Sequence, residues 1–271
     1  MDSSTQPLTI LPIGAFKDNY LWLLCRGNDA VVVDPGDAAP VEKALADRGF
    51  TLRAILLTHH HADHTGGVRA LLEARAGQAL PVYGPANEAI TGVTTTLKEG
   101  DRVAIDALGL SFDVFDIPGH TRGHIAYFAK ADGSAHRPAL LFCGDTLFAA
   151  GCGRLFEGTA AQMHASLNKL AALPPETQVY CAHEYTVANL RFARAVEPHS
   201  ADLARRVADA DATRARGEPT LPSTIALERA TNPFLRVDEA TVRAAAERHA
   251  PGASATALAT FTALRQWKDS F

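Results

Sequence analysis

A run of four histidines and one aspartate follows directly after an apolar stretch, and no other feature constrains the chain as strongly. The apolar stretch 54–57 leads through Thr58 into His59-His60-His61-Ala62-Asp63-His64. Side chains at i and i+2 of an extended segment share a face, so His59 and His61 can bind one metal ion. As the chain turns toward a helix, Asp63 and His64 can reach a second ion. For His60 we expect no ligand role, and a position either behind the ligands or facing solvent.

Three other apolar runs end in the same way, with His120, Asp145 and His183 just past their carboxyl ends. Binding sites of open α/β sheets form at that edge, so these residues can converge there. Five histidines and two aspartates are too many for one tetrahedral ion, but they suit two ions that share a carboxylate. We therefore predict one site from His59, His61 and His120, a second from Asp63, His64 and His183, and Asp145 as the bridge. Asp63 and Asp145 are also the predicted catalytic carboxylates. A glycine precedes both His120 and Asp145, which permits tight turns.

Short apolar runs alternate with helical patterns up to His183, which is typical of an α/β domain. Strands are predicted at 21–26, 30–34, 54–58, 81–83, 111–117, 125–129, 139–143 and 178–182, and helices at 39–48, 66–76 and 160–173. Beyond His183 the strand pattern disappears, and helices are predicted at 187–196, 201–215, 239–250 and 256–267. We predict two domains, residues 1–183 and an all-helical domain of residues 184–271.

Composition limits the partners that the chain can have. The formal net charge of −4 argues against a broad nucleic-acid surface, which needs clustered Lys and Arg. No apolar run approaches the roughly 18 residues of a membrane span, and the polar N-terminus does not resemble a signal peptide. The four cysteines are widely spaced, and Cys25 and Cys181 are expected to be buried without a disulfide. We expect a soluble, cytoplasmic monomer without nucleic-acid or membrane partners.

The chain resembles the metallo-β-lactamase superfamily in the pattern His59-x-His61-x-Asp63-His64 and in the later motif residues His120, Asp145 and His183. The resemblance implies an α/β fold, the four-layer αβ/βα sandwich with a dinuclear site at one edge of its two sheets, here with a small C-terminal all-helical domain. Further stretches resemble the glyoxalase II branch, namely 16–20, 151–158, 183–185, 231–234 and 265–269.

That second resemblance implies hydrolysis of the thioester of an S-2-hydroxyacylglutathione, such as S-D-lactoylglutathione, to glutathione and D-lactate, the second step of methylglyoxal detoxification. The implied nucleophile is a hydroxide that bridges two divalent metal ions. A thiol with a pKa near 8.5 leaves as a thiolate with little help from a general acid, which suits a thioester better than an amide. Zinc is the expected metal, while iron and manganese accept the same ligands.

The resemblance also implies that four residues bind the glutathione moiety: Arg154, Tyr185, Arg265 and Lys268. Glutathione carries two carboxylates, which cationic side chains recognise through charge-assisted hydrogen bonds. In the family the position of Arg154 is often Lys, which keeps the charge. The position of Phe156 is often Tyr, so this chain lacks a hydroxyl there.

Three alternatives remain open. An iron-dependent sulfur dioxygenase acting on glutathione persulfide shares much of the fold, but the helical region with Arg265 and Lys268 argues against it. A phosphodiesterase or ribonuclease is disfavoured by the acidic charge balance. A purely structural zinc protein is disfavoured because structural zinc sites are usually closed and hold a single ion.

Overall fold

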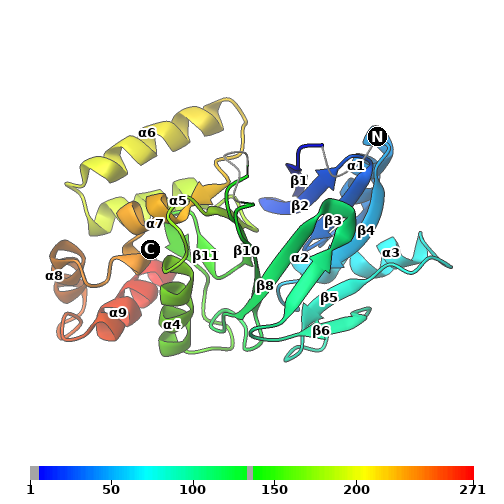
Figure 1. Cartoon of the computed structure of the whole chain (residues 1–271). Helices are drawn as coiled ribbons and strands as arrows, with labels where there is room; N and C mark the ends of the chain where they lie inside the picture. The colour runs from blue at the N-terminus through cyan, green and yellow to red at the C-terminus, as the bar shows by residue number, and fades with distance from the viewer. Residues whose placement is uncertain (1–5, 133–136) are drawn as a thin grey trace. The chain divides into compact units, whose positions relative to one another are not determined.

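In the computed structural model, described for residues 6–132 and 137–271, the chain forms two compact units (Figure 1). The first unit runs up to Asp116 and also includes Gly123–Gly144. The second unit contains Ile117–Arg122 and Asp145–Phe271. The predicted helical region therefore lies in one unit with residues 145–183, and the division of the chain into domains after residue 183 stays a proposal.

A six-stranded sheet in the order β1-β2-β3-β4-β5-β6 forms one layer of the first unit. Its strands are β1 (Thr9–Ala15), β2 (Asn19–Arg26), β3 (Asp29–Val33), β4 (Thr51–Leu56), β5 (Val82–Pro85) and β6 (Thr95–Leu97). Strands β1 to β3 pair antiparallel, whereas β3 to β6 pair parallel. The parallel pairs need crossover connections, and α1 (Ala38–Arg48), α2 (Ala62–Thr65) and α3 (Val68–Glu73) lie within these connections.

The helices of the first unit cover the sheet with their apolar sides. Helix α1 begins at the N-cap Asp37, whose carboxylate accepts the Ala39 amide, and buries Val41 and Leu45. These two side chains join the cluster that Val32 of β3 and Ile55 of β4 form with their buried neighbours. Alternation along each strand therefore directs one row of side chains toward the helices.

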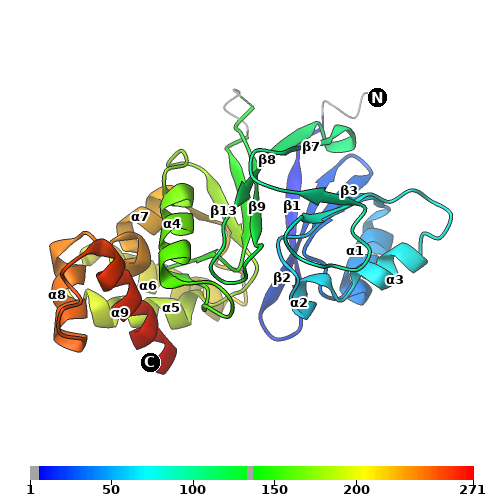
Figure 2. The ribbon, with the colours of Figure 1, turned by 90° about the horizontal axis from the view of Figure 1, so that it is seen from below.

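Four further strands of the first unit pair antiparallel in chain order: β7 (Arg102–Ile105), β8 (Leu110–Asp116), β9 (Ile125–Ala129) and β10 (Leu140–Gly144). A short 3-10 helix, η2 (Asp106–Leu108), connects the first two. The buried Tyr127 of β9 donates its hydroxyl to the carbonyl oxygens of Leu57 at 2.9 Å and Tyr83 at 3.3 Å. The two layers of strands are thus joined through the core of this unit (Figure 2).

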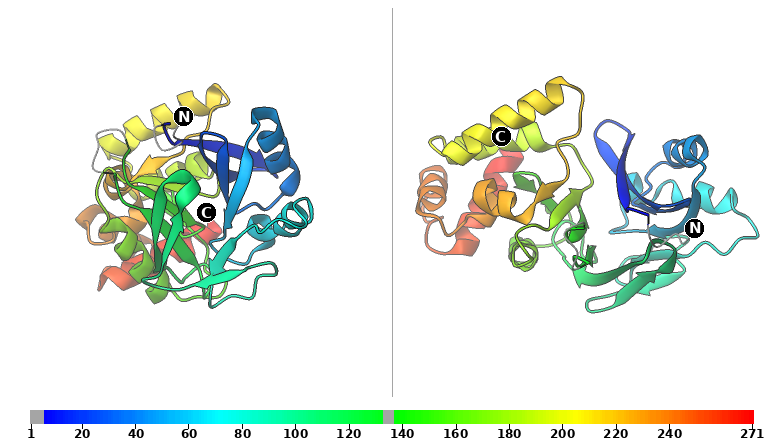
Figure 3. Two further views of the ribbon diagram at one scale, coloured as in Figure 1. Left: turned by 45° about the vertical axis from the view of Figure 1, so that its right-hand side comes forward. Right: turned by 45° about the horizontal axis from the view of Figure 1, so that its top comes forward.

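The second unit is mainly helical, and its helices appear from green-yellow to red in Figure 3. It contains the hairpin of β11 (Leu147–Phe148) and β12 (Gly151–Cys152), then α4 (Ala160–Ala171), β13 (Gln178–Cys181), α5 (Thr186–Val196), α6 (Ala201–Ala215), β14 (Ser223–Thr224), α7 (Ile225–Thr231), η3 (Pro233–Leu235), α8 (Ala240–His249) and α9 (Ala257–Ser270). Strand β14 pairs antiparallel with β13. The region predicted to be all-helical therefore contributes one two-residue strand as well as its helices.

Aromatic side chains fill the core of the helical region. The ring of Phe192 on α5 stacks on Phe234 of η3 at 5.9 Å between centroids, and Phe234 meets Phe261 of α9 at 5.7 Å. Trp267 lies 5.2 Å from Phe192 in an edge contact. Large apolar rings of this kind dominate the packing free energy where they are buried. Among the described residues, no helix combines the length and apolar composition that a membrane span requires.

Candidate metal and substrate site

The histidine run begins at His59, three residues after the last residue of β4, and His61 is the N-cap of α2. The Nε2 atom of His59 lies 3.1 Å from Nδ1 of His61, and the rings of His59 and His64 are 4.0 Å apart between centroids. His59 and His64 are buried. The first unit therefore brings three predicted ligands together, as the spacing of the run indicates.

Asp63 adds a carboxylate to this group of imidazoles. Its Oδ2 atom accepts a hydrogen bond from Nδ2 of Asn19 at 3.0 Å and lies 3.6 Å from Nε2 of His64. The Asn19 amide comes from the start of β2, so a strand far away in sequence orients this carboxylate. The first unit thus offers both nitrogen and oxygen donors.

Asp34, which the sequence analysis missed, orients His64. Its Oδ1 atom accepts the Thr58 amide at 2.8 Å, and its Oδ2 atom accepts the Thr58 hydroxyl at 2.7 Å and lies 3.0 Å from Nδ1 of His64. A carboxylate at one ring nitrogen fixes the orientation and tautomer of a metal-binding histidine and leaves the other nitrogen to bind the ion. The signal was present in the sequence, because Asp34 also follows an apolar run and precedes Pro35-Gly36.

His60 contacts a different carboxylate. Its Nδ1 atom lies 2.9 Å from Oε2 of Glu88, whose other oxygen accepts the Gly123 amide at 3.1 Å. The Glu88 side chain is buried. This arrangement gives His60 a partner outside the group of His59, His61 and His64, and its non-ligand role stays a prediction.

Both glycines that precede predicted ligands occupy conformations that other residues rarely adopt. Gly144 has φ 47°, and a Cβ atom there would lie 2.4 Å from Oγ1 of Thr58 and 2.8 Å from the His124 ring. Gly119 has φ 153°, and its Cβ would lie 2.8 Å from the backbone of Met163. Both positions therefore require glycine, as expected for tight turns beside ligands.

The second unit brings the other three predicted ligands together around one carboxylate oxygen. Oδ2 of Asp145 lies 3.4 Å from Nε2 of His120 and 3.3 Å from Nε2 of His183, and all three side chains are buried. Nδ1 of His120 lies 2.9 Å from the Arg154 carbonyl oxygen. Because only a protonated nitrogen can donate to a carbonyl, this contact assigns the proton to Nδ1 and the lone pair to Nε2.

The donor atoms of both units fit divalent metal ions. Each unit presents imidazole nitrogens next to a carboxylate. In the first unit Asp34 contacts Nδ1 of His64, and in the second the Arg154 carbonyl contacts Nδ1 of His120, so that Nε2 of each ring is left to bind an ion. Such mixed nitrogen and oxygen donors accept zinc, iron or manganese. All four cysteines lie in the part of the chain that the structure describes, where they are buried and form no disulfide, and none belongs to either set of ligands.

A pocket of about 410 Å³ in the second unit contains Asp145 and His120 together with every residue predicted to bind glutathione. It is lined by His120, Asp145, Phe148, Cys152, Arg154, Phe156, Tyr185, Ala188, Asn189, Arg265 and Lys268. The ring of Tyr185 stacks on His183 at 4.7 Å with an interplanar angle of 2°. Phe156 is 63% exposed, and its ring lies 5.2 Å from His120. Predicted ligands and predicted substrate-binding residues therefore share one cavity.

Three cations give this pocket a positive charge. Arg154 and Arg265 are accompanied by Asp269, whose Oδ1 lies 4.0 Å from Nε of Arg154 and accepts Nη2 of Arg265 at 3.0 Å. The Nζ atom of Lys268 lies 5.5 Å from the centre of the Phe192 ring. Burial, and then the charges of Arg265 and Arg154, lower the pKa of Lys268 below its usual value. Three cations against the two carboxylates of Asp145 and Asp269 leave an excess of positive charge that favours an anionic ligand.

Arg265 differs from the other two cations because it is buried, with 4% of its surface exposed. Its Nη1 atom donates to the carbonyl oxygen of Cys152 at 2.8 Å, and its guanidinium lies over the Phe234 ring at 5.2 Å. Arg154, in contrast, is exposed. Arg265 thus lines the pocket while also holding the backbone next to it.

Two sequence families match consecutive parts of the chain. The metallo-beta-lactamase superfamily matches residues 16–183, and the hydroxyacylglutathione hydrolase C-terminus matches residues 184–271. A hydroxyacylglutathione hydrolase from Cupriavidus taiwanensis is 58% identical over 268 residues, which are 97% of this chain and 99% of the relative.

Solved structures show the same fold. ETHE1 from Myxococcus xanthus superposes with a TM-score of 0.59 at 27% identity and covers 83% of each chain. TTHA1623 in a di-iron-bound form gives a TM-score of 0.57 at 29% identity over 83% of this chain and 100% of the other. These matches confirm the fold and the resemblance that the motifs indicated. The chain therefore belongs to the hydroxyacylglutathione hydrolase family, the glyoxalase II branch of the metallo-β-lactamase superfamily.

Proposed function

We propose that this chain hydrolyses the thioester of an S-2-hydroxyacylglutathione to glutathione and a 2-hydroxy acid. One observation carries the proposal: a single pocket contains the predicted metal ligands His120 and Asp145 together with the three cations Arg154, Arg265 and Lys268. The close relatives that are named hydroxyacylglutathione hydrolase support it over nearly the whole chain. The proposed substrate is S-D-lactoylglutathione, which yields D-lactate in methylglyoxal detoxification.

Two divalent metal ions are the proposed cofactors, with zinc as the expected metal and iron or manganese as alternatives. One ion would be held by His59, His61 and His120, and the other by Asp63, His64 and His183. Asp145 would bind both ions. Bound there, the ions would polarise the thioester carbonyl and lower the pKa of water. The di-iron form of a relative in the same fold supports the number of ions.

The residues of the pocket bind and orient the substrate. Glutathione offers two carboxylates, which the exposed Arg154 and the half-buried Lys268 would bind. The buried Arg265 would contribute its positive charge to the same pocket. The aromatic ring of Tyr185 forms part of the wall next to His183. Recognition of the peptide part would fix the thioester relative to Asp145 and His120, which lowers the entropic part of the barrier.

The reaction itself needs little acid catalysis. Water adds to the thioester carbonyl carbon and gives up its two protons, the carbon–sulfur bond breaks, and the acyl group is left as a carboxylate. The sulfur leaves as a thiolate because its thiol has a pKa near 8.5, and it takes up a proton from solvent. Asp63 and Asp145 are the proposed catalytic carboxylates. The proposed setting is the cytoplasm, where the chain would act as a monomer on a small molecule, without nucleic-acid or membrane partners.

Two assays on the purified, metal-loaded full chain test this proposal. We expect loss of the thioester absorbance of S-D-lactoylglutathione with release of one thiol per turnover. We expect no oxygen uptake with glutathione persulfide, the substrate of a sulfur dioxygenase. Oxygen uptake without thioester hydrolysis would reverse the assignment. A chain treated with a chelator is the control for spontaneous hydrolysis.

A further inference from the structure

The short hairpin of residues 147–152 connects several parts of the proposed site. Asp145 lies two residues before the start of β11. Arg154, whose carbonyl oxygen lies 2.9 Å from Nδ1 of His120, lies two residues after the end of β12. The ring of Phe148 within the hairpin contacts the rings of His183 at 5.9 Å and Tyr185 at 5.2 Å. A shift of this hairpin would therefore move Asp145, which is the predicted bridging ligand, and the Arg154 carbonyl, which contacts the predicted ligand His120. It would also move the Phe148 ring, which lines the pocket.

The hairpin has little stability of its own. It contains two residue pairs, Leu147 with Cys152 and Phe148 with Gly151. Its turn places Ala150 at φ 56°, a left-handed conformation that is uncommon for a residue other than glycine. An isolated two-stranded hairpin is at best marginally stable in water, and this one is shorter than most. Its geometry must therefore be maintained by groups outside it.

Side chains from the helical region supply that support through the backbone of the hairpin. Oε2 of Glu228 on α7 accepts the Ala150 amide at 2.8 Å and Nδ2 of Asn232 at 3.0 Å. Nδ2 of Asn232 also lies within donor distance of the carbonyl oxygens of Gly151 at 2.9 Å and Phe148 at 3.2 Å. Glu228 and Asn232 together thus bind both strands and the turn.

Two further helices hold the same hairpin. Nδ2 of Asn189 on α5 donates to the Ala149 carbonyl oxygen at 3.1 Å. On α9, Nη1 of Arg265 donates to the Cys152 carbonyl oxygen at 2.8 Å. Backbone groups of five consecutive hairpin residues therefore bond to side chains of the helical region.

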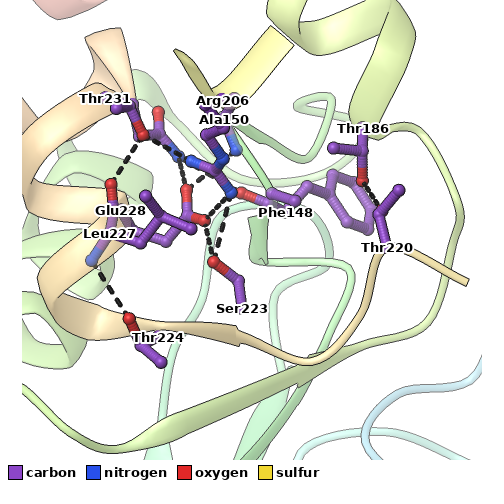
Figure 4. Close-up of polar contacts among 12 residues, drawn as sticks. Phe148, Ala150, Thr186, Arg206, Thr220, Ser223, Thr224, Leu227, Glu228 and Thr231 are labelled. Carbon is purple, nitrogen blue, oxygen red and sulfur yellow. Dashed lines mark hydrogen bonds and ion pairs between the residues drawn. The ribbon is translucent and has the colours of Figure 1, made fainter. Parts of the chain in front are cut away.

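Glu228 is itself held by a buried cation. Figure 4 shows its carboxylate next to Arg206 of α6 and Ser223 of β14, and its Oε1 atom accepts hydrogen bonds from both. Glu228 is 0% and Arg206 7% exposed. A buried ion pair adds little net stability compared with apolar residues of similar size, so stability alone does not account for a carboxylate at this position. Its second oxygen, which binds the hairpin, does account for it.

We infer that Glu228 and Asn232 are positioning residues, which hold the hairpin 147–152 so that Asp145, the Arg154 carbonyl and Phe148 keep their places in the site. The effect on catalysis rests on the proposed function, whereas the effect on the hairpin does not. The helical region would accordingly have a second role besides binding substrate. It would determine the geometry of ligands that precede it in sequence.

Two double variants with the same charge test this inference on the full-length, metal-loaded chain. Both replace Arg206→Met, and they differ in Glu228→Gln or Glu228→Met. The glutamine keeps an oxygen that can accept the Ala150 amide, while its amide group can donate to Ser223. The methionine has similar size and no oxygen. Comparing them removes the contribution of the buried ion pair, which both variants lack.

For the glutamine variant we expect kcat within about threefold of the parent. For the methionine variant we expect kcat to fall by about a hundredfold, the effect of displacing a reacting group by roughly 1 Å, with a smaller change in KM. Hydrogen exchange should show loss of protection at the Ala150 amide in the methionine variant only. The affinity for zinc, titrated against a chelator, should fall in the same variant.

Equal protection of the Ala150 amide in the two double variants would overturn the inference, whatever their activities. If the methionine variant does not fold, Asn232→Ala keeps the Arg206–Glu228 pair and is measured in the same way. We expect that variant to lose exchange protection across residues 148–151, and unchanged protection there would also overturn the inference. Because hydrogen exchange needs no substrate, it tests the hairpin even if the proposed reaction proves wrong.

Discussion

The predicted metal ligands of the two units are held in place by different parts of the structure. In the first unit, His59, His61, Asp63 and His64 lie within one short run after a buried strand, and Asp34 at the end of the adjacent strand holds His64. In the second unit, His120, Asp145 and His183 are far apart in sequence, and a marginal hairpin held by helices leads away from Asp145. Ligands in one run can be identified from spacing, whereas the support of dispersed ligands appears only in the folded chain.

The largest expected effect concerns the proposed link between the two halves. Asp145→Ala should lower metal content and kcat together, kcat by more than about a hundredfold, because it removes a ligand and not merely an outer partner, whose loss costs about ten- to a hundredfold. Elemental analysis and thioester kinetics on the same sample measure both. Two metal ions per chain with near-normal kcat would contradict the bridging role.

The next effect tests the support within the first unit. Asp34→Asn keeps the size of the side chain but replaces one of its two acceptor oxygens by an NH2 group, which only donates. The variant can therefore no longer accept all the hydrogen bonds from the Thr58 amide, the Thr58 hydroxyl and His64. We expect metal affinity to fall by about ten- to a hundredfold. Asp37→Asn, which alters only the N-cap of α1, is the matched control and should leave metal affinity unchanged. Equal affinities in the two variants would show that Asp34 does not support a ligand.

Within the second unit, Lys268→Ala should raise KM for an S-acylglutathione and leave metal content unchanged. Loss of one charge-assisted hydrogen bond costs about 1.5 to 3 kcal/mol, or roughly ten- to a hundredfold in kcat/KM. Lys43→Ala, at an exposed lysine of α1, is the control and should have no effect. An acyl thioester of an uncharged thiol should be a poor substrate and respond little to Lys268→Ala. An equal response of both thioesters would remove Lys268 from the proposed carboxylate site.

The smallest expected effect is a pH dependence that also depends on Lys268. Burial and the neighbouring charges of Arg265 and Arg154 lower the pKa of Lys268. Lys268 therefore loses its proton at a lower pH than an ordinary lysine, whose pKa is about 10.4. As pH rises through that lowered pKa, substrate binding weakens and kcat/KM decreases. Lys268→Arg stays charged and should move this decrease to higher pH. The substrate titrates identically with the parent chain and with the variant. If kcat/KM decreased at the same alkaline pH in both, Lys268 would be excluded as the cause of the decrease.

Much of the fold follows from sequence patterns where elements are long and regular. The predicted bounds of β9 and α6 agree with the structure at both ends, since one is a continuous apolar run and the other a capped amphipathic segment. Strands β11, β12 and β14 have two residues each, which is too short for any periodicity. Strand β1 contains Pro12 and Gly14, which weaken a strand pattern and are tolerated here because β1 is an edge strand.

The site shows the same division between local and distant information. Spacing and the apolar runs predict which residues carry donor atoms, and each unit gathers its own set. Spacing could not show that Arg265 is buried against the Cys152 carbonyl, because that contact joins residues more than a hundred positions apart. Glu228 was missed for the same reason, because its contact with the Ala150 amide joins residues 78 positions apart.

Cys152 lines the cavity in which the proposed reaction would release glutathione as a thiol. Burial is the main cause of the raised pKa of Cys152, and it raises the pKa of Cys25 to about 11 and of Cys181 to about 12. Only a thiolate attacks a disulfide, so these cysteines should exchange slowly with oxidised glutathione. We expect mass spectrometry of the native chain incubated with glutathione disulfide at neutral pH to show no added glutathione.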